Sequence, residues 1–411
     1  MSFKNKVKYG MAVLRVFFIT RLIQPFLRLI FGPYRPPNSD DQILTYAILA
    51  NNKPYYEFKH QKHSFLLKYQ GTKDLRYLER VDVSLYSVNK EEFLFVRTRP
   101  GVDIYNVEEH PFMYSIQHSA AVELLIVPHD TIFKYLRNKT VQDGSNIYYV
   151  HNHGRCGSTL VAAMIYQTNQ CIVLSEPAPI VNLAWMLNEK NCPPSRKSVE
   201  YLDLVRATFL LTCPDPNKKY LIKPWGIQTL SLLPLIHQAL PGIREFFMYR
   251  SISPTVLSFK KIFLDDLYAM GETAISMLPI NYRLLWNKIK QGDGEEAFFF
   301  IVLCQLHACI LEIQDRVDIK SFTYESLIEN RELFTSGLLK ELDIEENHHS
   351  KALSALKRDS QANSNLLSQK SLRNKNVTIT KSSLEWAKKI AFEHFEIYLE
   401  GTEGKIANQF I

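Results

Sequence analysis

The chain has 411 residues, of which 46% are hydrophobic and 22% charged, and this globular composition excludes a largely disordered protein. The net charge of +7 and the isoelectric point near 8.9 suit a polyanionic ligand or an acidic surface, but no array of basic and aromatic residues accompanies them, so nucleic acid is not an expected partner. The six cysteines follow neither a zinc-ligand spacing nor the dense pattern of a disulfide framework.

Residues 1–35 form a basic amphipathic segment with no acidic residue before Asp40. Arginines placed centrally in a bilayer cost roughly 2.5–3.5 kcal/mol each, which argues against a membrane-spanning helix. The pattern favours a helix in the membrane interface or a mitochondrial-type presequence over a Golgi signal anchor, and a helix packed on the protein is the alternative. We therefore expect a peripheral membrane contact, while the compartment stays open between membrane-associated, cytoplasmic, Golgi and mitochondrial.

Residues 36–140 are expected to form a strand-containing N-terminal extension. Apolar or alternating runs at 81–86, 93–96 and 121–127 predict strands, and Asp130 is the predicted N-cap of a short helix. No pattern in this extension indicates chemistry, so we expect it to cover the core or to shape a substrate pocket.

The next segment predicts a site for an anion. An apolar, β-branched and aromatic run at 147–150 breaks at Gly154 and Gly157 and restarts as a helix at Ser158 or Thr159. The glycines let the backbone curl so that consecutive N–H groups point inward, and the start of the helix adds the positive end of its dipole. An ordinary strand-to-helix turn is the alternative interpretation.

This loop departs from the Walker A pattern, because no lysine follows the second glycine. Arg155 precedes Gly157 instead, and Ser158 and Thr159 supply hydroxyls where a nucleoside triphosphatase has its lysine and magnesium ligand. The loop resembles the 5′-phosphosulfate loop of sulfotransferases that use 3′-phosphoadenosine 5′-phosphosulfate (PAPS). The resemblance implies that PAPS is the sulfuryl donor, bound without metal by residues Gly154, Arg155, Cys156, Gly157, Ser158 and Thr159. Cys156 is interpreted as a small uncharged side chain that fills its position.

A second segment strengthens the resemblance. Residues 245–250 read as a buried strand ending in Arg250, and a turn and a helix carrying Ser258 follow. In the sulfotransferase family, a strand-end arginine and a helix serine at this spacing bind the 3′-phosphate of the donor, and a guanidinium suits a phosphate dianion. A surface ion pair of Arg250 is the alternative.

Strands and helices alternate between residues 145 and 345, with further short strands at 171–174 and 220–223. This alternation predicts an α/β fold with a parallel sheet flanked by helices, similar to the P-loop-like sulfotransferase domain, over residues 141–411. Ligands bind such sheets at the carboxyl ends of the strands, where Glu176, Lys223 and Arg250 are placed.

The resemblance also bears on the catalytic base. Cytosolic family members carry a histidine two residues after the strand-end lysine, but here that position is Trp225. Tyrosylprotein and carbohydrate sulfotransferases use a glutamate after the strand that follows the phosphate loop, and Glu176 matches it. The resemblance thus implies Glu176 as general base and Lys223 as the cation near the departing phosphate. A strand-end carboxylate paired to a neighbouring arginine is the alternative for Glu176.

Later elements complete the prediction: an apolar helix at 295–313, a strand entering a helix at 318–327, a basic segment at 357–373 that is a solvated loop by default or a lid over the donor, and a closing amphipathic helix at 382–399. Together these features predict an enzyme, a PAPS-dependent sulfotransferase acting on a hydroxyl or amine of an unidentified acceptor. A kinase or nucleotide-binding protein on the same fold, and a catalytically inactive scaffold, are the alternatives.

Overall fold

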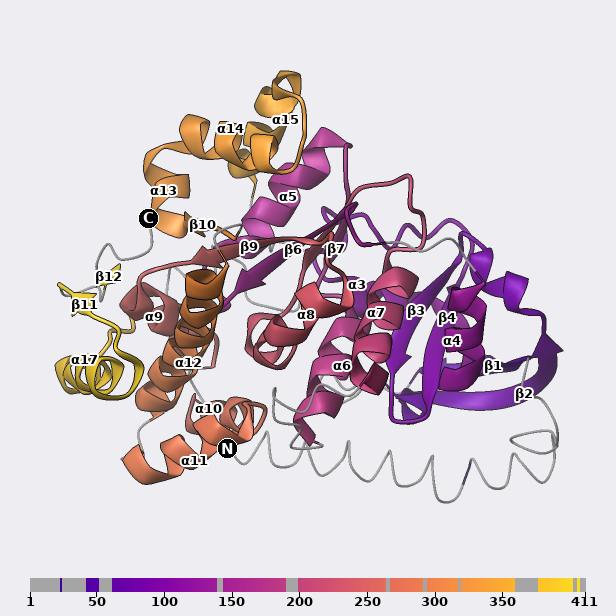
Figure 1. Cartoon of the computed structure of the whole chain (residues 1–411), viewed down its shortest axis with the longest axis horizontal. Coiled ribbons are helices and arrows are strands. Elements are labelled where there is room, and N and C mark those ends of the chain that lie inside the picture. The colour runs from indigo at the N-terminus through magenta and orange to yellow at the C-terminus, as the bar shows by residue number, and fades with distance from the viewer. Residues whose placement is uncertain are drawn as a thin grey trace.

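The computed structural model describes residues 23, 42–51, 61–138, 143–189, 199–263, 267–290, 294–316, 319–358, 376–401 and 405–406. Two five-stranded sheets organise this part of the chain, an antiparallel one on the N-terminal side and a parallel one that follows it (Figure 1). The predicted α/β class with a strand-containing N-terminal extension is therefore confirmed. The basic segment at 1–35, apart from residue 23, and most of the basic segment at 357–373 lie outside the described residues.

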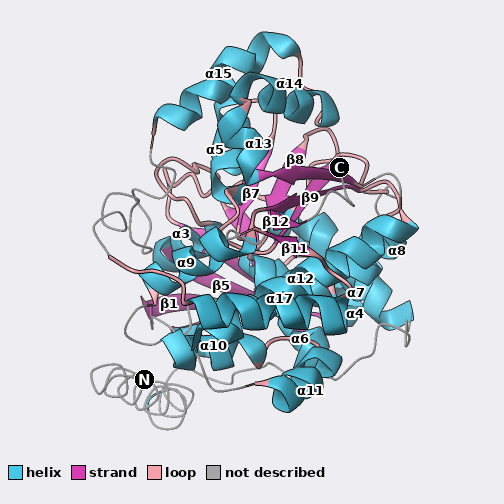
Figure 2. Cartoon of the chain, turned by 90° about the vertical axis from the view of Figure 1, so that its left-hand side faces the viewer, coloured by secondary structure: helices cyan, strands magenta, loops and turns pink. Residues whose placement is uncertain are grey.

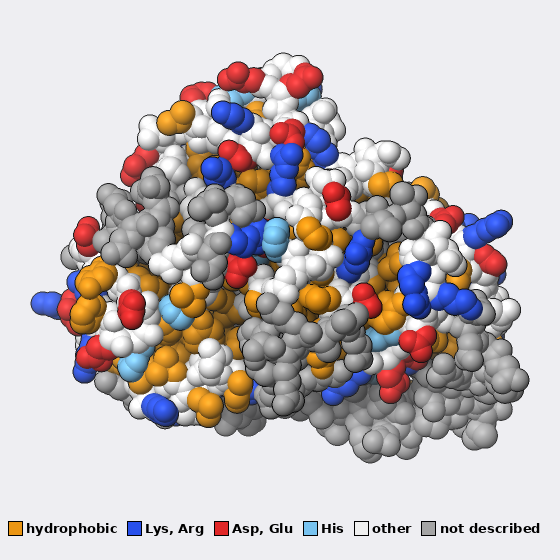
Figure 3. Space-filling model, viewed as in Figure 1, with side chains coloured by type: hydrophobic (Ala, Val, Ile, Leu, Met, Phe, Trp, Pro, Cys, Tyr) orange, Lys and Arg blue, Asp and Glu red, His pale blue; other side chains and the backbone are white. Residues whose placement is uncertain are grey.

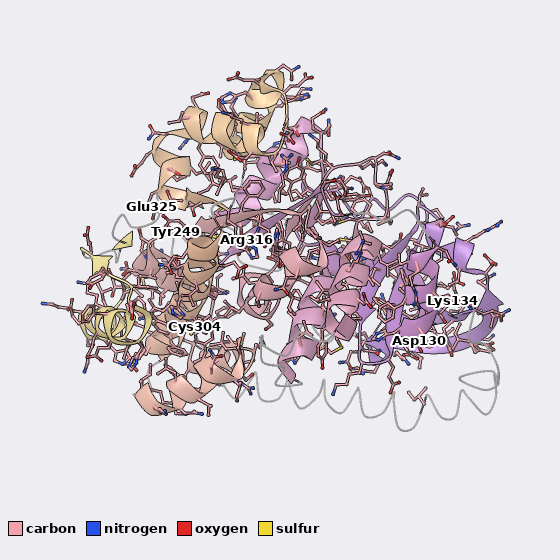
Figure 4. All side chains as sticks on the ribbon, in the orientation of Figure 1. Asp130, Lys134, Tyr249, Cys304, Arg316 and Glu325 are labelled. Atoms are coloured by element: carbon pink, nitrogen blue, oxygen red, sulfur yellow. The ribbon has the colours of Figure 1, made fainter. Side chains whose placement is uncertain are left out.

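The N-terminal sheet has the strand order β2-β1-β5-β4-β3, and every neighbouring pair is antiparallel. Its strands are β1 (Ile43–Asn51), β2 (Phe65–Lys73), β3 (Val83–Val88), β4 (Glu92–Thr98) and β5 (Ala121–Pro128), accompanied by the short helices η2 (Lys62–Ser64), η3 (Leu75–Glu79), α3 (Met113–Ala120) and α4 (His129–Arg137). The three strands expected from the sequence are present, whereas β1 and β2 were not predicted. Helix α4 begins at His129 after the extended residue Pro128, so the predicted N-cap at Asp130 is wrong; Asp130 lies in the first turn (Figure 4).

The parallel sheet has the order β10-β9-β6-β8-β7. Its strands are β6 (Ile147–Asn152), β7 (Ile172–Ser175), β8 (Tyr220–Lys223), β9 (Arg244–Tyr249) and β10 (Lys320–Thr323). After β6 the chain passes to β7 at one edge, returns through β8 and crosses to β9 on the other side of β6. The carboxyl end of β6 is thus a topological switch point, the position at which open α/β sheets bind ligands.

Helices cover both faces of the parallel sheet (Figures 1 and 2). The side chains of β6 alternate between two cores: Tyr148 and Val150 pack with α5 and α14, and Ile147 and Tyr149 pack with α6, α7 and α8. The helices near the sheet are α5 (Ser158–Thr168), α6 (Ala178–Glu189), α7 (Val199–Thr212), η4 (Gly226–Ser231), α8 (Leu233–Ala239), α9 (Ile252–Ile262), α13 (Tyr324–Glu329), α14 (Arg331–Glu341), η5 (Glu346–His348), α15 (His349–Ser354) and η6 (Ala355–Lys357).

A helical subdomain flanks the β10 side and contains α10 (Leu267–Ile275), α11 (Ile280–Ile289), α12 (Gly294–Asp315), α17 (Lys381–Phe395) and the small ladder β11 (Leu399–Glu400) with β12 (Lys405–Ile406). Helix α12 confirms the predicted apolar helix. Its length and composition would also suit a membrane span, but 83% of its most apolar window is buried inside the protein, packed against α9, α10 and α17. It is therefore the central helix of this core.

Candidate active site

The loop after β6 has the curled backbone that the sequence predicts. Gly154, Arg155 and Gly157 have φ values of 75°, 55° and 89°, and α5 begins directly afterwards at Ser158. A Cβ on Gly157 would lie 2.5 Å from Cδ2 of Tyr324, so this position needs glycine for space as well as for its left-handed conformation. The curl and the helix start direct backbone N–H groups and a positive dipole end toward one point, which favours an anion.

The side chain of Asn152 fixes the loop on the side of β8. Its Oδ1 accepts a hydrogen bond from Gly154 N at 3.0 Å, and its Nδ2 donates to the carbonyl oxygens of Val150 and Pro224 at 3.2 and 3.1 Å. The backbone of Gly226 passes so close that a Cβ there would lie 2.3 Å from the Asn152 carbonyl oxygen. The start of η4 and the loop are consequently packed backbone against backbone.

The side chain of His153 fixes the loop on the side of β9. Its Nε2 accepts the backbone N–H of Arg250 at 2.8 Å, and its Nδ1 lies 2.9 Å from the Gly154 carbonyl oxygen. The imidazole is fully buried, and this burial lowers the pKa of His153 to about 4. The ring is therefore neutral at physiological pH.

Arg155 and Ser258 meet, although 103 residues separate them in the chain: Arg155 Nε donates to Ser258 Oγ at 2.9 Å. Ser258 lies on α9, which follows β9 directly. The hydroxyl thus holds the arginine of the loop beside the helix that was predicted to carry the 3′-phosphate serine.

Arg250 follows the last residue of β9, and its guanidinium lies over the ring of Tyr324, 4.3 Å from the ring centre. Arg250 Nε is buried and has no hydrogen-bond partner among the described residues. Glu325 fixes the neighbouring turn by accepting hydrogen bonds from Ser251 N at 3.1 Å and Ser251 Oγ at 2.8 Å, beside the end of β9 (Figure 4). Arg250 is thus supported on one face by the Tyr324 ring and retains an unpaired Nε donor among the described residues.

Glu176 and Lys223 form a buried ion pair at the carboxyl ends of β7 and β8, where Lys223 Nζ donates to Glu176 Oε1. The backbone reinforces the pair, because Glu176 N donates to the Lys223 carbonyl oxygen at 2.7 Å while Glu176 adopts a φ of 53°. Phe112, from the loop before α3, covers the lysine with its ring centre 5.6 Å from Nζ. The N-terminal extension thereby contributes one wall around this pair.

The remaining predicted residues of the loop, Cys156, Ser158 and Thr159, are buried. Cys156 is fully buried in an apolar cluster, and this burial raises the pKa of its thiol, so it is not poised as a nucleophile. Ser158 and Thr159 are 5% and 7% exposed at the start of α5. Among the described residues, no cluster of three or more His, Cys, Asp or Glu side chains is arranged to hold a metal ion.

Beneath the site, a buried charge network joins the sheet to α12. His151 Nε2 lies 2.7 Å from Glu245 Oε2, and Arg316 from the end of α12 pairs with the other oxygen of Glu245 (Figure 4). The hydrogen bond from His151 and the charge of Arg316 outweigh the effect of burial and lower the pKa of Glu245. The network ties β6 to β9 immediately below the loop.

Several residues of the site carry no recognisable signal in the sequence. Asn152 and His153 stand out there only as part of the loop, Phe112 not at all, and Tyr324 as a mostly structural tyrosine. A spacing pattern signals residues that a family shares, whereas these side chains act through contacts with distant segments. The assignment of Glu176, Lys223, Arg250 and Ser258 to catalysis and donor binding stays a prediction.

The molecular surface agrees with the mild net charge. Figure 3 shows acidic and basic side chains interspersed over this face of the protein, with no extended field of one sign among the described residues. A cavity of about 450 Å³, lined by residues including Tyr105, Ile172 and Tyr220, lies at the amino ends of β7 and β8, opposite the candidate site.

The fold and site define an α/β protein with a curled, glycine-containing loop between the central strand of a parallel sheet and the helix that follows it. No protein-family model and no curated protein matches the chain.

Solved structures that it resembles include a sulfotransferase domain from the curacin biosynthetic pathway (12% identity, 60% of this chain and 97% of that one, TM-score 0.34), retinol dehydratase in complex with retinol and PAP (10%, 67% and 89%, 0.35) and a sulfotransferase from Mycobacterium avium (9%, 67% and 83%, 0.36). At such identities and TM-scores, these likenesses establish neither activity nor acceptor.

Proposed function

We propose that the protein is a sulfotransferase that moves a sulfuryl group from PAPS to a hydroxyl or amine of an acceptor. The observation that carries the proposal is the convergence of two separate anion-binding elements at the switch point of the sheet, the loop at 154–159 and Arg250 with its unpaired Nε. A donor with phosphates at both its 5′ and 3′ positions needs two such elements.

The donor-binding roles follow from the contacts. Backbone N–H groups of the loop and the hydroxyls of Ser158 and Thr159 bind the 5′-phosphosulfate, with the dipole of α5 behind them. Arg250 and Ser258 bind the 3′-phosphate, since a guanidinium with an unpaired donor gives charge-assisted hydrogen bonds to a phosphate dianion. The loop also carries Arg155, whose charge stays near the phosphates because Ser258 holds its Nε.

The chemical roles fall to the buried pair at the ends of β7 and β8. A bond forms between the acceptor oxygen or nitrogen and sulfur, while the bond from sulfur to the bridging phosphate oxygen breaks and its electron pair stays on the phosphate. Glu176 takes the proton of the acceptor, and Lys223 with Arg155 stabilises the charge that grows on the phosphate oxygen.

Calorimetric titration with adenosine 3′,5′-bisphosphate (PAP) tests the proposal. Wild-type protein is expected to bind PAP saturably, and Arg250→Ala is expected to weaken binding by roughly 10- to 100-fold, as the loss of a charge-assisted hydrogen bond implies. Arg244→Ala, at the exposed amino end of the same strand, is the matched control and should bind normally. An absence of saturable binding by the wild type would overturn the proposal.

Two alternatives have distinct signatures. A kinase on this fold would turn over ATP with magnesium and would not bind PAP, and the missing Walker lysine disfavours it. An inactive scaffold would bind PAP, but Glu176→Gln would leave its cellular function unchanged.

We further propose how the chain divides this work. Residues 141–411 bind the donor, residues 36–140 contribute to the acceptor side through Phe112, and the basic residues 1–35 give a peripheral membrane contact. Sedimentation with anionic vesicles, comparing the full chain with a form lacking residues 1–35, tests the membrane contact; equal sedimentation of both forms would contradict it.

A further inference from the structure

One side chain joins the two proposed phosphate-binding elements. His153 Nε2 accepts the Arg250 N–H at 2.8 Å, while His153 Nδ1 lies 2.9 Å from the Gly154 carbonyl oxygen. Because a backbone N–H can only donate, Nε2 carries no proton; the proton of the neutral ring is therefore on Nδ1, which donates to Gly154. A single tautomer of His153 thus bonds to the start of the loop and to the end of β9 at the same time.

The two elements depend on this bridge to different degrees. The loop is also anchored through Asn152, which bonds to Gly154 and to the Pro224 carbonyl oxygen on the β8 side. For the backbone N–H of Arg250, the hydrogen bond to His153 is the contact that the described part of the chain provides. Loss of the imidazole acceptor therefore leaves the loop held and removes the bond that fixes the Arg250 N–H, between Tyr249, which stays paired with β10, and Ser251, which stays bonded to Glu325.

We propose that His153 is a positioning residue that sets the spacing between the 5′- and 3′-phosphate sites and so gives the protein its preference for 3′-phosphorylated nucleotides. This inference rests on the proposed function. The ribose joins the two phosphates of PAP at a fixed separation, so both bind together only when the loop and Arg250 are in register. A nucleotide with a 5′-phosphate alone needs the loop and is insensitive to the position of Arg250.

The test compares the dissociation constants of PAP and of AMP, which lacks the 3′-phosphate. His153→Phe keeps the ring volume and removes the acceptor; the ratio of the AMP constant to the PAP constant is expected to fall about tenfold or more, with AMP binding changed less than about threefold. His153→Gln has a side-chain oxygen that can accept a hydrogen bond from the same N–H. Its ratio of AMP to PAP dissociation constants is expected to stay close to that of the wild type. His307→Phe removes a partly buried histidine of α12 that is hydrogen-bonded to Tyr282 of α11, away from the site, and should leave the ratio unchanged.

The outcomes separate the two hypotheses. If the wild type does not bind PAP, the proposed function fails; if it does, and His153→Phe weakens PAP and AMP equally or neither, the role of His153 in selectivity is overturned. That role is also overturned if His153→Gln has the same melting temperature as the wild type but a ratio of AMP to PAP dissociation constants as low as that of His153→Phe. Proton–nitrogen correlation NMR of the wild type gives a check that needs no variant: an Nδ1–H tautomer supports the bridge, and an Nε2–H tautomer contradicts it.

Discussion

The guanidinium carbon of Arg250 lies 4.3 Å from the centre of the Tyr324 ring, although the two residues belong to different strand-to-helix connections. The parallel pairing of β9 and β10, in which Thr323 lies opposite Tyr249, places them side by side. The ring covers one face of the guanidinium. Tyr324 also fills the space that Gly157 leaves by lacking a Cβ, so it contacts both proposed phosphate sites.

Replacing Tyr324 tests whether its ring holds the Arg250 guanidinium in place. Tyr324→Leu removes a cation–π contact worth roughly 0.5–2 kcal/mol, so PAP is expected to bind roughly 2- to 30-fold more weakly. Tyr324→Phe keeps the aromatic face and is the control, with binding expected within about twofold of the wild type. Calorimetric titration of both variants with PAP measures the difference, and an equal loss in the two would show that the ring face is not what holds Arg250.

Glycine at position 157 is required for two reasons that a pair of variants separates. Gly157→Ala strains a left-handed residue and also drives a Cβ to 2.5 Å from Tyr324, whereas Gly101→Ala, at a φ of 79°, meets nothing within 4 Å. Strain alone costs roughly 1–3 kcal/mol. Urea unfolding should show a larger loss for Gly157→Ala than for Gly101→Ala, and only Gly157→Ala should lose PAP binding. Equal unfolding midpoints would mean that Tyr324 moves aside freely.

The part of the fold that sequence predicts best is the parallel sheet. Strand β8 occupies the predicted residues, and β6, β7 and β9 start or end within two residues of their predicted bounds, because each is a short apolar run that stops at a polar or glycine-rich connection. Strands β1 and β2 were missed because β1 follows a proline-rich stretch that reads as a linker, and β2 carries a half-exposed, mixed pattern. Such strands are defined by pairing with distant partners.

Within the site, the sequence predicted which residues lie at strand ends or on the helices that follow them, but not which of these residues contact one another. Arg155 and Ser258 are 103 residues apart and Glu176 and Lys223 are 47 apart, and no local pattern encodes which strand ends become neighbours. That depends on the strand order, in which β8 and β9 flank β6. His153 stood out only as part of the loop, because a histidine is an ordinary loop residue until its two partners, Gly154 and Arg250, are known.

Protonation of His153 predicts a pH dependence of stability. Its pKa is about 4 in the folded protein against 6.5 for the free side chain, so between these values the unfolded chain binds the proton and the folded chain does not. The neutral imidazole therefore makes its full contribution to the free energy of unfolding above pH 6.5. This contribution, about 3 kcal/mol in total, is lost as the pH falls toward 4. Urea unfolding of wild type and His153→Gln from pH 7 to pH 4.5 measures it. The variant should lose less stability than the wild type on acidification. If the free energies of unfolding of the two proteins fall in parallel with pH, the imidazole is not buried in its neutral form.

If Glu176 is the general base, replacing it should lower the rate of sulfuryl transfer without lowering the affinity for the donor nucleotide. Glu176→Gln keeps the volume and an oxygen that can accept from Lys223 but cannot take a proton, so donor turnover should fall roughly 10²- to 10⁴-fold while PAP affinity changes less than about threefold. Glu92→Gln, in the Lys62–Glu92 pair of the N-terminal sheet, controls for the loss of a paired carboxylate and should keep full activity. Unaltered turnover by Glu176→Gln would remove Glu176 as the base.

The structure of the complex with PAP tests the proposed donor site most directly. We expect the 3′-phosphate at the guanidinium of Arg250, on the side away from Tyr324 and beside Ser258, with the 5′-phosphate at the backbone N–H groups that follow Gly154. PAP bound elsewhere, such as in the 450 Å³ cavity at the amino ends of β7 and β8, or with its 3′-phosphate away from Arg250, would contradict the proposed site.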